Sequence, residues 1–238
     1  MQFNVGLENG DENRSVAWVF GHPGCYAYGP DPQSALSAAP QAIRDYAAWI
    51  ENHCEETWLD GGDCQVNLAE NYDVFFTDEN YDRVTSGYGV NAWFWNDWKP
   101  LEPLEVERTL RLLEWSRADL LETTCTLPQA VLDRSYPGER WSIAGILKHV
   151  AGAEWWYLDR LGLAFPRAVL HNDTYERLEK VRAHLVQVLP TLVGAIRVNG
   201  IDGEFWSPRK MLRRAVWHER DHTQHILKLL TPLTAVPE

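Results

Sequence analysis

The chain has 238 residues, 45% of them apolar, so it can bury a substantial core and global disorder is excluded. Asp and Glu outnumber Lys and Arg by 34 to 22, for a net charge of −12. This balance argues against nucleic acid or an anionic membrane as a partner, because neutralising phosphates requires a basic surface. There is no CxxC pair among the four cysteines, the first residues are polar, and no apolar run reaches the ~18 residues of a membrane span. We therefore expect a cytoplasmic protein.

The first part of the chain predicts a small sheet with one helix. Residues 3–7 alternate between apolar and polar, as in a half-buried strand, and a turn at 8–14 leads to a second strand. A helix should start near Pro32 and run to Ile50, with a break or kink at Pro40. The remaining expected strands are residues 15–20, 25–28 and 64–70, with a weak one at 74–77. The apolar residues 90–95 are either a last strand or the entry to the next unit.

Several short motifs of this part occur in a characteristic order: His22-Pro23-Gly24-Cys25-Tyr26, Gly29, Ala35-Leu36 and Ala42-Ile43. In this arrangement the first seventy residues or so resemble the small domain of HicB-type antitoxins. No DNA-binding ribbon or helix-turn-helix follows. We therefore expect a small α/β accessory domain rather than a toxin-binding one.

After a proline-rich linker at 98–103, the pattern changes to long helices. They are expected at residues 104–125, 141–161, 173–196 and 207–230, with Pro190 disturbing the end of the third. Four long helices that follow one another, with only loops between them, predict a four-helix bundle. The expected fold class is α+β, with an α/β domain at residues 1–98 and a bundle at 99–238.

The last predicted helix carries histidines where a bundle helix normally carries apolar residues. Its core-facing stripe is spaced by 4, 3, 4, 3 and 4 residues and consists of Met211, Ala215, His218, His222, His225 and Leu229. The second helix has His149 on its own apolar stripe. Inward imidazoles from two helices favour a metal site with three nitrogen ligands over isolated core histidines.

Helix geometry limits which histidines can share an ion. His218 and His222 are one turn apart and can converge on one metal, as can His222 and His225. His218 and His225 are ~10 Å apart along the axis, which is too far for ligand bonds of ~2.1 Å. Glu219 and Asp221 point off the stripe, towards solvent or a neighbouring helix. A basic cluster (Arg209, Lys210, Arg213 and Arg214) is expected to be a solvated helix start.

Two segments of the predicted bundle carry a second resemblance. They are Glu139-Arg140-Trp141-Ser142-Ile143-Ala144 leading to Leu147-Lys148-His149-Val150-Ala151, and Trp206-Ser207-Pro208-Arg209-Lys210 leading to His218-Glu219-Arg220-Asp221-His222. Residues 100–238 thereby resemble the DinB-like family of four-helix-bundle metal proteins, which includes YfiT-like hydrolases and thiol-dependent transferases and isomerases.

The resemblance implies which residues hold the metal. One histidine of the second helix and the HxxxH of the fourth form the family's metal triad, and the matching positions are His149, His218 and His222. His225 falls where many relatives have Gln, so we expect it in the pocket wall or behind the ligands. The other candidates to line the pocket are Glu154, Trp155, Trp156, Tyr157 and Trp217. The family also suggests a homodimer.

Two functions remain open from the sequence. The first is a metal-dependent enzyme acting on a small molecule, with zinc or nickel lowering the pKa of a bound water or thiol. It would be a hydrolase, or a transferase or isomerase that uses a low-molecular-weight thiol. The second is a non-catalytic regulatory protein whose antitoxin-like domain binds a partner, with a structural or vestigial metal. The inward triad favours the first, and the sequence identifies no catalytic residue beyond it.

Overall fold

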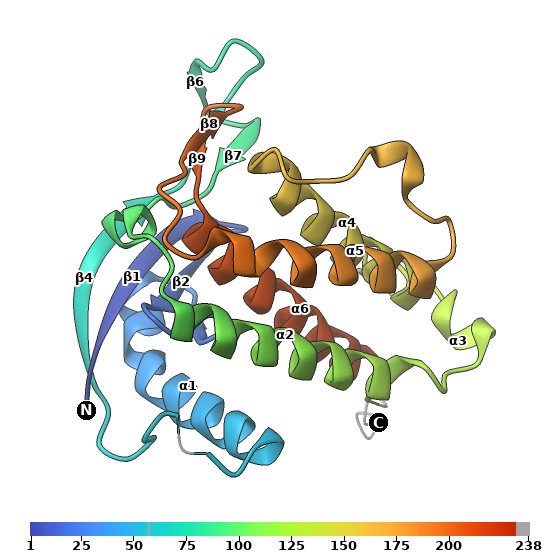
Figure 1. Ribbon diagram of the computed structural model, residues 1–238, viewed down its shortest axis with the longest axis horizontal. Coiled ribbons are helices and arrows are strands. Elements are labelled where there is room, and N and C mark those ends of the chain that lie inside the picture. Colours follow the sequence, from blue (N-terminus) through green and yellow to red (C-terminus); the bar gives the residue numbers. More distant parts are fainter. Residues whose placement is uncertain (57, 232–238) are drawn as a thin grey trace, which may run out of the picture.

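A computed structural model describes residues 1–56 and 58–231 of the chain. An N-terminal sheet lies against a group of long C-terminal helices (Figure 1). The last described residue, Thr231, is the C-cap of the final helix, so the end of the predicted domain at 232–238 lies outside the described residues. No helix in the described part is both long and apolar enough to cross a membrane.

The main sheet has four strands in the order β3-β2-β1-β4. β1 (Gln2–Asp11), β2 (Arg14–Val19) and β3 (Tyr26–Gly29) form an antiparallel meander, and β4 (Gln65–Asp73) pairs parallel to β1. The predicted turn at 8–14 is shorter than expected: β1 continues to Asp11, and Glu12 and Asn13 make the turn with positive φ. The four predicted strands that build this sheet are thus confirmed, with boundaries shifted by a few residues.

The helix α1 (Pro32–His53) covers one face of this sheet. Asp31 caps it by accepting a hydrogen bond from the Ser34 amide. The expected break at Pro40 is wrong, because the helix continues through it. A proline inside a helix costs ~3 kcal/mol. A buried stripe against the sheet offsets this cost, and its members are Ala35, Ala39, Ile43, Ala47 and Ile50.

Three short strands precede residues 90–95, for which the sequence left open a last strand or the entry to the next unit. β5 (Phe75–Thr77) pairs with β6 (Arg83–Val84) and β7 (Tyr88–Val90), so the apolar run at 90–95 mostly follows a strand instead of forming one. The 3₁₀ helix η1 (Trp95–Trp98) comes next. A separate hairpin of β8 (Asn199–Ile201) and β9 (Glu204–Trp206) precedes the last helix.

The four predicted long helices are present. They are α2 (Pro103–Thr124), α4 (Ile143–Arg160), α5 (Thr174–Val188) and α6 (Pro208–Leu230). α4 contacts both α5 and α6, and α2 contacts α6. α5 ends earlier than predicted, because the segment around Pro190 forms the 3₁₀ helix η3 (Leu189–Leu192). The connections contain α3 (Gln129–Leu132) and the 3₁₀ helix η2 (Arg167–Val169).

The first half of α6, from Pro208 to Glu219, is buried except for the half-buried Arg209. The basic cluster at its start is therefore not the solvated helix start that we expected. Lys210 pairs with Glu204 at 2.7 Å, Arg213 with Asp97 at 2.8 Å, and Arg214 with Glu8. Burial would raise the pKa of Glu8, but the charges of Arg214 and Arg213 outweigh it and lower that pKa.

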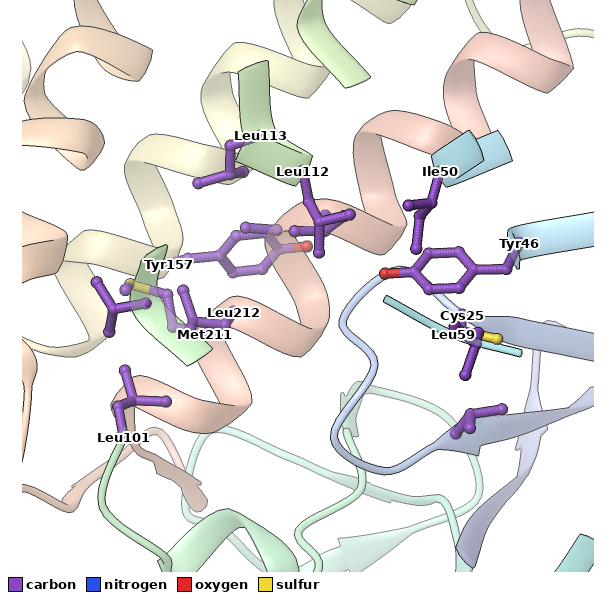
Figure 2. Packing of buried hydrophobic residues seen from close by; sticks show 14 of the residues in the cluster. Cys25, Tyr46, Ile50, Leu59, Leu101, Leu112, Leu113, Tyr157, Met211 and Leu212 are labelled. Atoms are coloured by element: carbon purple, nitrogen blue, oxygen red, sulfur yellow. The ribbon is translucent and has the colours of Figure 1, made fainter. Parts of the chain in front are cut away.

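One hydrophobic core joins the sheet to the helices. Figure 2 shows Tyr46 and Ile50 of α1 on one side of it, and Leu112 of α2 and Leu212 of α6 on the other. His22, in the turn between β2 and β3, packs edge-on against the rings of Phe3 and Tyr46. The division at residue 98 stays a prediction, since the two parts share this core and the ion pairs of α6.

A second set of buried ion pairs connects the four long helices. Glu219 of α6 accepts hydrogen bonds from Arg117 of α2 and Arg182 of α5, both at 2.6 Å. Arg182 also pairs with Glu154 of α4 at 2.8 Å. The two guanidinium groups balance the two carboxylates, and all four residues are at least nine-tenths buried. Helix positions in the bundle therefore depend on this network.

We expect Arg182→Met to reduce the free energy of unfolding by about 3–5 kcal/mol, because it leaves two carboxylates buried without their shared partner. Urea denaturation measures this loss. The control is Lys180→Met, two residues away on the same helix and half-buried, which should cost less than about 1 kcal/mol. Equal losses in the two variants would contradict the network's role.

His22 should make the fold sensitive to acid. Burial, aided by the positive charge of Arg108, lowers the pKa of His22 from 6.5 to about 4. Between these values the unfolded chain binds the proton more readily, so stability is fully present above about pH 6.5 and falls as the pH approaches 4. The contribution is roughly 3 kcal/mol.

Urea denaturation at several pH values should therefore show a flatter profile for His22→Phe than for the unaltered protein. His22→Gln, which packs differently but also cannot take up the proton, should flatten it equally. Profiles parallel to that of the unaltered protein would show that His22 does not titrate in this way.

Candidate metal site

Three histidine rings meet between α4 and α6. Nε2 of His218 lies 3.0 Å from Nε2 of His149 and 3.2 Å from Nε2 of His222. The ligand atoms of the three residues all lie within 4.8 Å of one another. Because His218 and His222 are one turn apart, both rings leave α6 on the same side, towards α4. The residues that the sequence reasoning proposed as ligands thus come together.

The donor set fits a divalent transition metal. Two nitrogens bound to one ion at ~2.1 Å lie about 3.0–3.4 Å apart in octahedral or tetrahedral geometry. The separations of His218 from His149 and from His222 fall in this range, and all three ligand atoms lie within 4.8 Å of one another. Three imidazoles without a carboxylate are typical ligands for zinc or nickel. His149, His218 and His222 are also the one group of potential metal ligands found among the described residues.

The surroundings keep these imidazoles uncharged, the form in which a ring nitrogen can bind a metal. Burial lowers the pKa of all three, well below the ordinary value for His218 and to about 3 for His222. The charge of Arg140 contributes at His149. The Trp141 ring stacks on His149 with centroids 4.4 Å apart, which fixes the orientation of that imidazole.

The N-terminal sheet forms the opposite wall of the pocket at this site. The pocket measures about 790 Å³ and is lined by His149, His218 and His222 on one side and by Tyr26 and Tyr28 of β3 on the other. Its volume is that of a small-molecule site. Two hydrogen bonds join the walls: the Tyr26 hydroxyl donates to Asp221 at 3.2 Å, and the Trp217 indole donates to the Tyr28 hydroxyl at 2.9 Å.

A second hollow of about 350 Å³ borders two of these imidazoles, those of His149 and His218. His149, Trp156, Tyr157 and His218 line it. The Tyr157 ring meets the His218 ring edge-on, with centroids 6.1 Å apart. The triad therefore lies between two spaces, a large one shared with the sheet and a small aromatic one.

The other residues that the sequence suggested for the pocket lie in several different places. Trp217 lines the large pocket, and Trp156 and Tyr157 line the small hollow. His225 lines the large pocket and pairs with Glu139 at 3.0 Å, outside the triad. Glu154 lines neither space, because Arg182 and Arg117 hold it in the ion network between the helices. The indole of Trp155 donates to the Phe165 carbonyl and lines neither space.

Sequence reasoning missed the contributions of the sheet and of Asp221. Asp221 does point off the histidine stripe, but it faces Tyr26 across the pocket. Burial raises the pKa of its carboxyl group. The alternation of Tyr26 and Tyr28 on one face of β3 was a visible signal, but nothing in the sequence shows that this face meets α6.

Fold and site together define a helical domain with an inward cluster of three histidines. The family model of the DinB superfamily matches residues 112–226, which contain all three ligand candidates. The superfamily is a metal-binding one, in agreement with the donor set. No curated protein and no solved structure matches the chain. The resemblance of the N-terminal part to HicB-type antitoxins lies outside the matched residues and stays a prediction.

We expect zinc or nickel at a hundred times its Kd to add ~2.7 kcal/mol to the free energy of unfolding. For a chain of this length the melting temperature should rise by roughly 5–10 °C. Thermal unfolding of chelator-treated protein, with and without added metal, measures the change. His222→Ala should abolish the rise, whereas His225→Ala should keep it. A rise of the same size in His222→Ala would contradict the assigned triad.

Proposed function

We propose that this protein is a metal-dependent enzyme acting on a small molecule, with the metal held by His149, His218 and His222. The observation that carries the proposal is the convergence of three uncharged Nε2 donors on one side of a large pocket. Three protein ligands leave a coordination position for a reactant, as in catalytic rather than structural sites.

The bound metal would supply Lewis-acid chemistry, which activates a water or a thiol and polarises an oxygen of the substrate. The chain's own residues would bind and orient the substrate. Tyr28 and Trp217 offer aromatic walls joined by a hydrogen bond, and they would exclude water from that side. Asp221 and the Tyr26 hydroxyl would accept or donate hydrogen bonds to polar groups of the substrate.

Two versions of the reaction use this arrangement. In one version the protein is a hydrolase. In the other it is a transferase or isomerase that uses a low-molecular-weight thiol. Both need a small reactant that enters between α6 and the sheet. We also propose that the protein is cytoplasmic, as its sequence suggests, and that it forms a homodimer, on the strength of its resemblance to the family.

A non-catalytic regulatory protein is the alternative. In that case the antitoxin-like part would bind a protein partner and the metal would only stabilise the fold. The pocket favours the enzyme, because a purely structural metal needs no adjoining space of about 790 Å³ shared by the sheet and the helices.

Cobalt(II) substitution tests the proposal, because its visible spectrum reports changes in coordination. We expect 2-mercaptoethanol or azide to alter the spectrum of the cobalt protein, with no such spectrum in His149→Ala. A response to the thiol supports the transferase or isomerase version. A response to azide alone, with metal-dependent hydrolysis of p-nitrophenyl acetate, supports the hydrolase. A spectrum unchanged by both reagents would refute an open metal site and favour the non-catalytic alternative.

A further inference from the structure

Two arginines reach the large pocket at the histidines, one from each part of the chain. Arg14 begins β2 in the sheet, and Arg140 lies shortly before α4 in the helical part. Both side chains line the pocket of about 790 Å³. Neither is closed off from solvent, because the side chain of Arg14 is 32% exposed and Arg140 is an exposed residue. A ligand in the pocket can therefore contact both guanidinium groups without a rearrangement of the fold.

An aromatic ring of the pocket supports each of these guanidinium groups. Cζ of Arg14 lies 3.8 Å from the centre of the Tyr28 ring, and Cζ of Arg140 lies 4.7 Å from the centre of the Trp141 ring. The attraction between a cation and the face of a ring holds the cation in place. The Trp141 ring in turn stacks on the imidazole of His149. The arginines are therefore positioned by side chains that belong to the site.

Several hydrogen-bond donors of the basic residues in this pocket are unused. Arg14 donates through Nη2 to Glu12 at 2.8 Å, whereas its Nη1 donates to no described residue. Of its nitrogens without a partner, only Nε is buried, so Nη1 is accessible. Arg140 has neither a hydrogen bond nor an ion pair within the described part of the chain, and the same holds for Lys228, which also lines the pocket. These donors can therefore receive an anionic group.

The carboxylates of the same pocket, in contrast, already have partners. Asp221 accepts a hydrogen bond from the Tyr26 hydroxyl, and Glu139 pairs with His225 at 3.0 Å. The third carboxylate is that of Glu12, which pairs with the arginine of the sheet. The charged groups that lack a partner are therefore positive, which favours a ligand with a negative charge over one with a positive charge.

The charge of a bound metal points the same way and limits the size of the negative charge. Uncharged imidazoles leave both positive charges of a divalent ion uncompensated. An activated water or thiol carries one negative charge, so a substrate with one more completes the balance. A second charge on the substrate would be repelled by the carboxylates of the lining. The basic and acidic residues of that lining balance one another: Arg14, Arg140 and Lys228 against Glu12, Glu139 and Asp221.

We propose that the substrate is a small organic carboxylate and that Arg14 and Arg140 bind its carboxylate group. The N–H bonds of a guanidinium lie in one plane and match the two oxygens of a carboxylate. The rest of the substrate faces the three histidines. This inference rests on the function proposed above and adds the chemical class of the substrate. Because one arginine belongs to the sheet and the other to the helical part, both parts of the chain form the binding site.

Benzoate and benzamide are the probes, because they share size and shape and differ in charge. In isothermal titration calorimetry of the zinc-loaded protein, we expect benzoate to bind about tenfold more tightly than benzamide, since charge-assisted hydrogen bonds are roughly twice as strong as neutral ones. Phenylphosphonate, which carries a second negative charge above neutral pH, should bind more weakly than benzoate. No binding of benzoate, no preference for it over benzamide, or tighter binding of phenylphosphonate would overturn the proposed substrate class.

Arginine variants locate the carboxylate. Arg14→Met and Arg140→Met should each remove most of the preference for benzoate and leave benzamide binding unchanged. The control is Arg134→Met, which removes an exposed arginine from the same α3–α4 connection but outside the pocket lining, and it should keep the preference. Far-UV circular dichroism shows whether the variants fold, and Arg14→Gln replaces Arg14→Met if the latter does not. A preference that persists in either pocket variant, as direct binding of benzoate to the metal would produce, would overturn the role of the two arginines.

Metal-free protein separates this inference from the function on which it rests. After chelator treatment the preference for benzoate should remain and should still be lost in Arg140→Met, because the arginines bind the carboxylate without the metal. A metal-free protein without this preference would overturn the role of the arginines, even if the cobalt protein responds to azide. A cobalt protein that responds to neither azide nor 2-mercaptoethanol would refute the open metal site, even if the preference for benzoate persists.

Discussion

The structure depends on the charged side chains that α6 buries in its first half. A lysine and two arginines enter the interior there, and each would be very costly without a partner. Their partners come from three separate places in the chain: Glu8 on β1, Asp97 in η1 and Glu204 on β9. These requirements fix α6 relative to the sheet as firmly as the shared apolar core does, and they explain why a helix so rich in charge can lie at the centre of the molecule.

The geometry of the histidine site follows from this fixed position. Glu219, one residue after His218, is held by Arg117 and Arg182, so a neighbouring face of the helix is anchored to α2 and α5. The face with His218 and His222 is thereby directed at His149 and at the two tyrosines of β3. One helix thus carries two of the three ligand candidates and places them at the pocket.

Much of this arrangement was predictable from periodicity and capping. Ser207 and Pro208 mark the start of α6, and the spacing of the histidines placed the ligands on one face. Rules based on neighbouring residues failed where residues far away in the sequence determine the local structure. The basic cluster looked solvent-exposed because its carboxylate partners, apart from Glu204, lie far away in the sequence. Pro40 looked like a helix breaker because the packing of α1 on the sheet cannot be read from the residues around it. Glu154 looked like a pocket residue because its partner Arg182 lies on another helix.

The pairing of Glu8 with Arg214 spans 206 residues of sequence. On the ribosome, where chains grow by about 5–20 residues per second, the first strand must wait roughly 10 to 40 s before the arginine exists. During that interval the nascent sheet can form its strands and receive α1, but Glu8 and Asp97 still lack their cations. Completion of the fold is therefore tied to the release of the C-terminal helix, and a truncated chain that lacks α6 should be recognised by the cell as unfinished.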